Sequence, residues 1–296
     1  MGRRPSASST APACSPAAGP SPSSNAPGPT ASPSRSFTTA TGRAGQPRTC
    51  RPRSVHASSP DDLNLIASKA DLVGLNEVGA RKAFLENWAA NNGWWLYAPG
   101  GTNQAGEALI AKKSMFDVLD KGSIFVCDTN GPGEVPPARY NNWVKYRHKA
   151  TGRNVTHVNA HAVASIETAG RPEDLPRTRC AEAQFQGLKE LAVDKQDEGQ
   201  VIVSGDLNVD SSADRSYGYA KFPWQVFEAN ELPNLRSNYN LYGEKGTGTH
   251  GNRHIDYVYF WKRLPEYQLM WMTGYDIVGG TKSDHNCVVA TFSIQS

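Results

Sequence analysis

The sequence predicts a mixed α/β domain in which helices cover two packed β-sheets. Segments with a helical period of apolar residues alternate with short apolar runs that are typical of strands, and the strands outnumber the helices. Some strands are joined by tight turns, as at "ATGR" (150–153), and others are joined by helical segments. Tight turns join antiparallel strands, whereas helical crossovers can join parallel strands. The sheets are therefore predicted to be mixed.

The first 60 residues differ in composition from the rest of the chain. They contain eleven of the twenty Pro residues and seven Arg, but no Lys, Asp or Glu. Such a segment buries too little apolar surface to offset its chain entropy, so residues 1–60 are predicted to be a disordered, low-complexity tail. Two origins remain open: a true flexible tail, or a segment produced by out-of-frame reading of GC-rich DNA.

Residues 61–296 form the predicted folded domain, which is long enough for one large core. The first helix begins after Ser59, a suitable N-cap, and has acidic residues in its first turn. Helices are predicted at 58–70, 79–93 and 177–196, and strands at 71–78, 94–98, 106–113, 122–128, 141–149, 154–161, 200–208, 254–261, 266–273 and 286–294.

Charge, cysteine content and hydropathy exclude several classes of protein. The net charge is +3 and the tail contributes +7, so residues 61–296 carry −4 and give no general support for nucleic-acid binding. Five Cys without CxxC spacing argue against a zinc ribbon; they allow one disulfide, and free buried thiols are favoured. No apolar run approaches the roughly 18 residues of a membrane span, and no signal peptide follows Arg3 and Arg4. The predicted location is therefore the cytoplasm, and a monomer is expected.

Polar side chains recur at the ends of the predicted strands. Asn159 and His161 end one strand two residues apart, and therefore on one face, and Asp206 and Asn208 end another in the same way. Any one of these residues fits an ordinary turn. The set is harder to explain in that way, because a buried acid is costly unless it is paired or bound to a metal. Its members are Glu77, Asn159, His161, Asp206, Asn208, Asp256, Asp284 and His285.

These residue types indicate hydrolysis of a phosphate ester. Carboxylates and amides without Cys ligands make an oxygen-rich site that suits Mg²⁺, Mn²⁺ or Ca²⁺. A His beside an Asp suits a general base that is held in one tautomer. A hard cation neutralises the charge that develops on phosphate oxygens, while the base takes a proton from water.

Five ordered motifs, "GLNEV", "VNAH", "SGDLN", "HIDYV" and "SDHNCVVATF", resemble the endonuclease/exonuclease/phosphatase family, which includes deoxyribonuclease I and inositol-polyphosphate phosphatases. The resemblance covers roughly residues 61–296, which it marks as the catalytic domain. It implies a four-layer α/β/β/α sandwich of the deoxyribonuclease I type, with one metal-dependent site at the sheet edges. Each motif is weak alone, and their order makes the set specific.

The resemblance also implies roles for the acidic and amide residues. Glu77 would be the primary metal ligand, and Asp284 would be a second carboxylate of the metal site. Asp206 would position or activate the attacking water, and Asn208 would hold the phosphate or that water.

The histidines have roles of their own in this resemblance. His285 would be the general base or a phosphate contact, and Asp256 would orient it. His161 would donate a hydrogen bond to a phosphate oxygen in the transition state. Asn159 lies on the same face as His161 and is a candidate contact of the substrate phosphate.

Two further residues are candidates, and one expected feature is missing. Arg139 would contact the phosphate, and Glu107 would hold the His161 ring. The family opens with a strand whose Asn helps to hold the metal, but residues 26–63 contain no Asn. Residues 35–42 are the only plausible strand in that segment.

The motifs predict phosphoester hydrolysis but leave the substrate open. The leading hypothesis is a divalent-metal-dependent phosphodiesterase, most simply a nuclease that acts on DNA. The alternatives are a phosphomonoesterase that acts on inositol phosphates or another small phosphorylated molecule, and a degenerate family member that binds without cutting.

Overall fold

The computed structural model describes residues 35–36, 60–99, 106–128 and 138–296, which lie in one compact unit, Pro33–Ser296. The predicted tail lies almost entirely outside these ranges. Of the predicted strand at 35–42, only β1 (Arg35–Ser36) is described, and it pairs antiparallel with Ile294 and Ser293.

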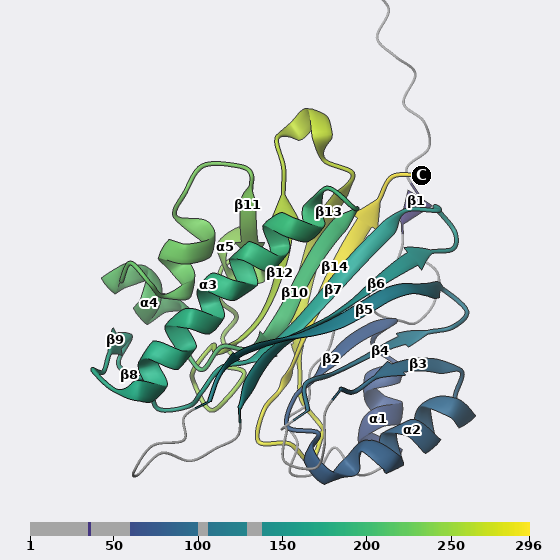
Figure 1. Ribbon diagram of the computed structural model, residues 1–296, viewed down its shortest axis with the longest axis horizontal. Coiled ribbons are helices and arrows are strands. Elements are labelled where there is room, and N and C mark those ends of the chain that lie inside the picture. Colours follow the sequence, from purple (N-terminus) through teal and green to yellow (C-terminus); the bar gives the residue numbers. More distant parts are fainter. Residues whose placement is uncertain (1–34, 37–59, 100–105, 129–137) are drawn as a thin grey trace, which may run out of the picture. The chain divides into compact units, whose positions relative to one another are not determined.

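A six-stranded sheet with the order β11-β12-β10-β7-β6-β5 forms one inner layer of the molecule (Figure 1). Within it, β10 runs parallel to β7 and antiparallel to β12, as expected for mixed sheets. The bounds are β5 (Phe116–Cys127), β6 (Arg139–His148), β7 (Asn154–His161), β10 (Gln200–Asp206), β11 (Asn234–Ser237) and β12 (Asp256–Lys262).

Two three-stranded sheets, β2-β4-β3 and β1-β14-β13, form the second inner layer. On β14, Val288 and Ala290 face the larger core, which is shared with the six-stranded sheet, and Cys287 and Val289 face a smaller core beneath two helices. The strand bounds are β2 (Leu72–Leu75), β3 (Trp94–Tyr97), β4 (Ala108–Lys112), β13 (Met270–Val278) and β14 (Cys287–Ile294).

Helices cover both outer faces of the paired sheets (Figure 1). The long helix α3 (Pro176–Gln196) begins with Pro at its first turn and packs Phe185 and Leu188 against the six-stranded sheet. On the opposite side, α1 (Pro60–Ala67) and α2 (Lys82–Asn91) cover β2, β4 and β3. The order of helix, sheet, sheet and helix confirms the predicted four-layer sandwich.

The segment between β10 and β12 contains elements that the sequence did not predict. These are α4 (Ser211–Tyr217), a π-helical turn (Trp224–Glu228), β11 and α5 (Asn238–Tyr242). Gly, Pro, Asn and Ser interrupt any long apolar period there, so only tertiary packing defines these short elements. The short pair β8 (Glu167–Thr168) and β9 (Arg171–Pro172) was also missed.

A disulfide joins Cys127, the last residue of β5, to Cys180 in α3, with a Cα–Cα distance of 5.6 Å. Cys287 is disulfide-bonded as well. The preference for free buried thiols is therefore wrong for these three residues. A search of the described helices for one that is long and apolar enough to span a bilayer finds none.

Candidate active site

Three neighbouring strands of the six-stranded sheet place polar residues side by side. The register pairs Asp206 of β10 with His161 of β7 on one side and with Asp256 of β12 on the other. All three side chains are buried. This alignment requires Gly205, because a Cβ at that position would lie 2.0 Å from the carbonyl oxygen of Ala160. The strand ends predicted from sequence therefore meet in one row.

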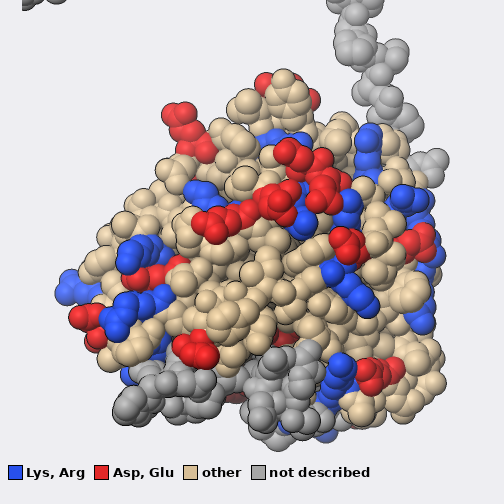
Figure 2. Space-filling model, viewed as in Figure 1, with Lys and Arg blue, Asp and Glu red and all other residues tan. Residues whose placement is uncertain are grey.

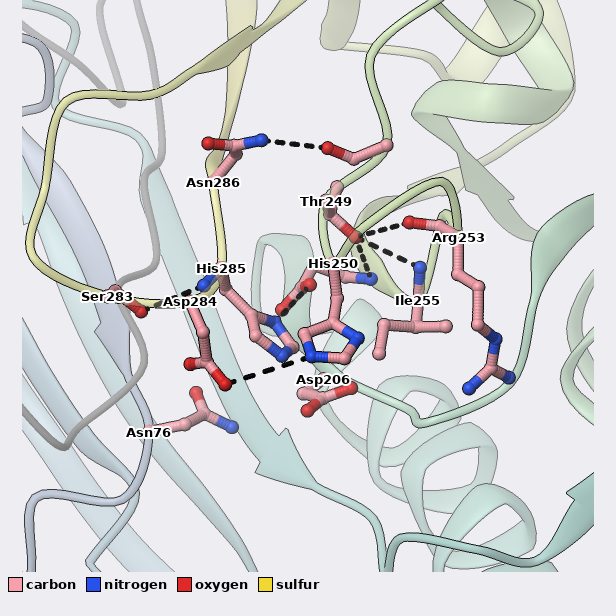
Figure 3. A network of polar contacts seen from close by, with 12 residues as sticks. Asn76, Asp206, Thr249, His250, Arg253, Ile255, Ser283, Asp284, His285 and Asn286 are labelled. Atoms are coloured by element: carbon pink, nitrogen blue, oxygen red, sulfur yellow. Dashed lines mark hydrogen bonds and ion pairs between the residues drawn. The ribbon is translucent and has the colours of Figure 1, made fainter.

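His285 reaches this row from the segment that precedes β14 (Figure 3). Its Nδ1 lies 2.7 Å from Oδ2 of Asp256, and both side chains are almost completely buried. An ionised carboxylate only accepts hydrogen bonds, so Nδ1 donates and Nε2 is the basic atom of the neutral ring. This is the geometry of a general base whose tautomer is fixed by an acid.

The second imidazole, His161, carries its proton on the other ring nitrogen. Its Nδ1 lies 3.4 Å from Nη1 of Arg139, and a guanidinium cannot accept, so Nδ1 is the acceptor. The proton of the neutral ring then sits on Nε2. That atom lies 3.5 Å from Oδ2 of Asp206 and 3.7 Å from Oε1 of Glu77. His161 can therefore donate at the point where two carboxylates converge.

Arg139 lies among the carboxylates that surround His161. Burial lowers the pKa of Arg139, and the charges of Glu107, Asp206 and Glu77 oppose that effect, with Glu107 the strongest of the three. The guanidinium is also the group that fixes His161 Nδ1 as an acceptor. We therefore propose that Glu107 acts on His161 through Arg139.

Two site residues have a left-handed backbone, Glu77 with φ 56° and Asn208 with φ 55°. Asn tolerates this conformation, whereas for Glu it is uncommon and typical of functional sites. The Asn208 N–H donates to Oδ1 of Asp206 at 2.8 Å, and its side chain donates to the Ala162 carbonyl at 2.9 Å. The turn after β10 therefore orients the Asp206 carboxylate.

Asn159, a candidate contact of the phosphate, lies deep between the two sheets. Its amide nitrogen donates to the Leu75 carbonyl at 2.9 Å and to the Ala108 carbonyl at 3.2 Å, and none of the residue is exposed. A Cβ at Gly74 would lie 2.4 Å from its Oδ1, so the amide occupies the space that this glycine leaves. We propose that Asn159 joins the sheets and does not contact substrate.

The structure adds two site residues that the sequence reasoning missed. Asn76 precedes Glu77, and its amide donates to the Ala160 carbonyl at 2.8 Å, while no described residue donates to its buried Oδ1. The ring of His250 lies 4.6 Å from that of His285, and its Nε2 lies 3.7 Å from Oδ2 of Asp284 (Figure 3). Asn76 lies within the "GLNEV" motif and His250 lies four residues before "HIDYV", but only the folded register places them in the site.

The donor atoms suit a divalent cation. Asp206, Asp256 and His285 each offer a ligand atom, all within 4.8 Å of one another, and so do His250, Asp284 and His285, whereas Glu77, the predicted primary ligand, belongs to neither group. The buried oxygen of Asn76 also needs a positive or hydrogen-bonding partner. A set dominated by carboxylate and amide oxygens fits Mg²⁺ or Mn²⁺ better than a thiophilic metal.

The fold and the site together define a phosphoester hydrolase. Residues 53–285 match the model of the Endonuclease/Exonuclease/phosphatase family, and the chain belongs to that family. Its members hydrolyse phosphoesters and generally depend on a divalent metal ion, so this chain is a hydrolase of the same kind. No curated protein matches the chain in sequence.

Solved structures with the same fold name different ligands or activities. The human Nocturnin catalytic domain with bound sulfate has a TM-score of 0.59 and 14% identity, and the match covers 88% of this chain and 96% of that one. D. rerio TDP2 with a single-strand DNA product has a TM-score of 0.61 and 11% identity, covering 83% and 98%. Mannosyl-6-phosphatase of Bacteroides thetaiotaomicron VPI-5482 has a TM-score of 0.54 and 17% identity, covering 83% and 98%. At these identities the similarity shows the fold alone.

Proposed function

We propose that this chain is a Mg²⁺- or Mn²⁺-dependent phosphodiesterase that acts as a nuclease on DNA. One observation supports this function most directly: the Nε2 atoms of two buried imidazoles have opposite roles. His285 Nε2 is basic because Asp256 accepts from Nδ1, and His161 Nε2 carries a proton because Arg139 donates to Nδ1. Hydrolysis of a phosphate ester uses one group that takes a proton from water and another that donates to a phosphate oxygen.

The assigned residues divide the reaction between them. Glu77, Asp284 and the Asn76 oxygen would hold the cation, which when bound supplies positive charge to the phosphate oxygens. Asp206, held by the Asn208 N–H, orients the attacking water.

The two histidines have different roles: one takes a proton from the water, and the other donates a hydrogen bond to the phosphate. His285 takes the proton of the water at Nε2, and the Asp256 carboxylate, 2.7 Å from Nδ1, stabilises the imidazolium that forms. His161 donates a hydrogen bond from Nε2–H to a non-bridging phosphate oxygen. As the water oxygen bonds to phosphorus, the P–O bond to the leaving group breaks, and the leaving oxygen takes a proton from solvent. Arg139 maintains the His161 tautomer throughout, because it can only donate.

DNA is proposed as the substrate because of one structurally similar protein, and not because of the overall charge of the chain. TDP2 was solved with a single-strand DNA product. On the face shown in Figure 2, Lys and Arg lie scattered among Asp and Glu, and no continuous basic stripe crosses the described residues of that face. DNA would therefore be held by local contacts near the site. The phosphomonoesterase alternative draws on the mannosyl-6-phosphatase neighbour.

The disulfides favour a different compartment from the one predicted by sequence. Cys127–Cys180 and the disulfide-bonded Cys287 are typical of oxidising environments, because cytosolic thiols are kept reduced. We propose that the protein acts in an oxidising compartment outside the cytoplasm.

The function is tested by nicking of supercoiled plasmid with Mg²⁺ or Mn²⁺. We expect nicking that EDTA and His285→Ala both abolish. His148→Gln is the control, because His148 contacts Thr151 at the opposite end of β6. Phosphate release from mannose 6-phosphate or inositol phosphates without nicking would replace the diesterase proposal with a monoesterase. No turnover of any of these substrates would contradict catalysis altogether.

A further inference from the structure

A cavity of about 190 Å³ lies beside the catalytic row, between α4, the π-helical turn and α5. Ser211, which lines it, follows Asn208 by three residues, and Tyr239, which also lines it, donates its hydroxyl to the Asp256 carbonyl at 2.7 Å. One wall of the cavity therefore begins five residues after Asp206, and another contacts the backbone of Asp256 through Tyr239. The proposed mechanism uses none of its side chains.

Glu228 supplies the buried acidic group of this cavity. It is 5% exposed, and the Ser237 hydroxyl and backbone N–H donate to its carboxylate. No described residue donates to its Oε2. Burial raises the pKa of Glu228 to about 7. A buried carboxylate oxygen without a donor is costly, so the site is suited to a ligand that brings an N–H or O–H group.

A planar wall lies beside this acid. The guanidinium carbon of Arg215 lies 4.8 Å from the ring centroid of Trp224, and both residues line the cavity. Arg215 is exposed, so its outer face is accessible. Guanidinium and indole planes are the surfaces on which unpaired bases stack in complexes with single-stranded nucleic acids.

The volume of the cavity matches a single ring system. A protein cavity of about 150 Å³ holds benzene, so about 190 Å³ accepts one substituted heterocycle. Carboxylates accept from the amino group of cytosine. Stacking on a flat wall favours a planar base over a puckered sugar ring.

We propose that this cavity binds one nucleobase of the substrate strand, stacked on the Arg215–Trp224 pair, with its exocyclic amino group donating to Glu228. The inference rests on the proposed nuclease function and adds a base preference to it. Adenine, cytosine and guanine carry an amino group, and thymine does not. The enzyme therefore prefers amino-bearing bases near the scissile phosphate.

The test compares kcat/KM on homopolymer oligonucleotides of cytosine and thymine of equal length, above the pKa of Glu228, with bis(p-nitrophenyl) phosphate as a substrate without a base. We expect the wild-type protein to prefer cytosine roughly tenfold, the scale of one good base contact. In Glu228→Gln, Ser237 keeps the amide oxygen and the amide N–H₂ faces the base, so the preference is lost or reversed.

Trp224→Ala provides a second variant if Glu228→Gln does not fold, and it is expected to lower the rate on both oligonucleotides more than on the small diester. The exposed Glu231→Gln, outside the cavity, serves as the matched control. Equal wild-type rates on both oligonucleotides, or an unchanged ratio in Glu228→Gln, would overturn the base site. Inhibition by a free hexose but not by cytidine would do the same. Turnover of the small diester in these cases leaves the proposed phosphodiesterase standing, whereas no turnover of any diester contradicts that function itself.

Discussion

Strand β7 carries two buried histidines four residues apart on one face, and their surroundings differ completely. In the middle of the sheet, His157 Nε2 lies 2.8 Å from the Ser204 hydroxyl, and burial lowers the pKa of His157 to about 3. At the strand end, His161 lies among Glu77, Asp206 and Arg139. Burial with neutral partners gives a structural histidine, whereas charged partners at the sheet edge give one that can handle protons.

The largest expected effect separates these two histidines. His161→Ala should lower kcat by about 10²–10³, because it removes a donor to the developing phosphate charge, and should leave the free energy of unfolding nearly unchanged. His157→Ala should do the reverse, lowering stability with little effect on kcat. Rates and urea denaturation of both purified variants test this contrast. Similar losses of kcat in the two variants would contradict the assignment of a structural role to His157 and a catalytic role to His161.

The disulfide should stabilise the edge of the sheet next to the site. Cys127 pairs with Arg139 across β5 and β6, and the disulfide closes a separation of 53 residues. Replacing Cys127 and Cys180 together by Ser should lower the free energy of unfolding by about 2–4 kcal/mol. Thermal unfolding measures this loss. Because dithiothreitol also reduces the disulfide of Cys287, both proteins are compared in dithiothreitol, where they should have similar Tm values. A variant as stable as the wild type without dithiothreitol would contradict the prediction.

A smaller effect is expected where the two sheets touch in the middle. Gly74→Ala would place a Cβ 2.4 Å from both Asn159 Oδ1 and Ser204 Oγ, so we expect a loss of about 1–3 kcal/mol in stability. Gly274→Ala is the matched control, because a Cβ there meets no atom within 4 Å. Equal free energies of unfolding for the two variants in urea would show that the polar residues between the sheets accommodate the added Cβ without a loss of stability.

A pH dependence of stability is also expected, and it comes from the middle of the sheet. Below its ordinary pKa of 6.5, His157 binds a proton in the unfolded chain, but in the folded chain only near pH 3. Stability conferred by His157 is therefore present above pH 6.5 and is lost as the pH falls towards 3, by about 1.4 kcal/mol per pH unit. In urea titrations at several pH values, His157→Leu should lack this slope. If the free energies of unfolding of the wild-type protein and His157→Leu changed with pH in parallel, the lowered pKa of His157 would be contradicted.

The sequence predicted the layers and the polar strand ends because both depend on local patterns. The strand predicted at 154–161 is β7 in the structure, and Glu77 of "GLNEV" and Asp206 of "SGDLN" lie next to His161. The contrast between His157 and His161 could not be predicted, since it arises from neighbours on other strands.

Two other features of the site could not be predicted because they depend on long-range contacts, and one misplaced strand has a local cause. The position of Asn159 between the sheets depends on Gly74, far away in the chain, and the contact of His250 with His285 depends on a bridge between distant segments. The strand predicted at 266–273 lies instead at Met270–Val278, because Pro265–Tyr267 forms a 3₁₀ turn.

The central claim, that distant segments build one hydrolytic centre, is tested most directly by a double-mutant cycle in kcat between Asp206→Asn and His285→Ala. Each single variant should lower kcat by about 10² or more, since Asp206 orients the water from which His285 takes the proton. The double variant should then lose little more than the worse single variant, because residues that act as one unit are not additive. Multiplied losses, or single variants with wild-type rates, would contradict a shared centre.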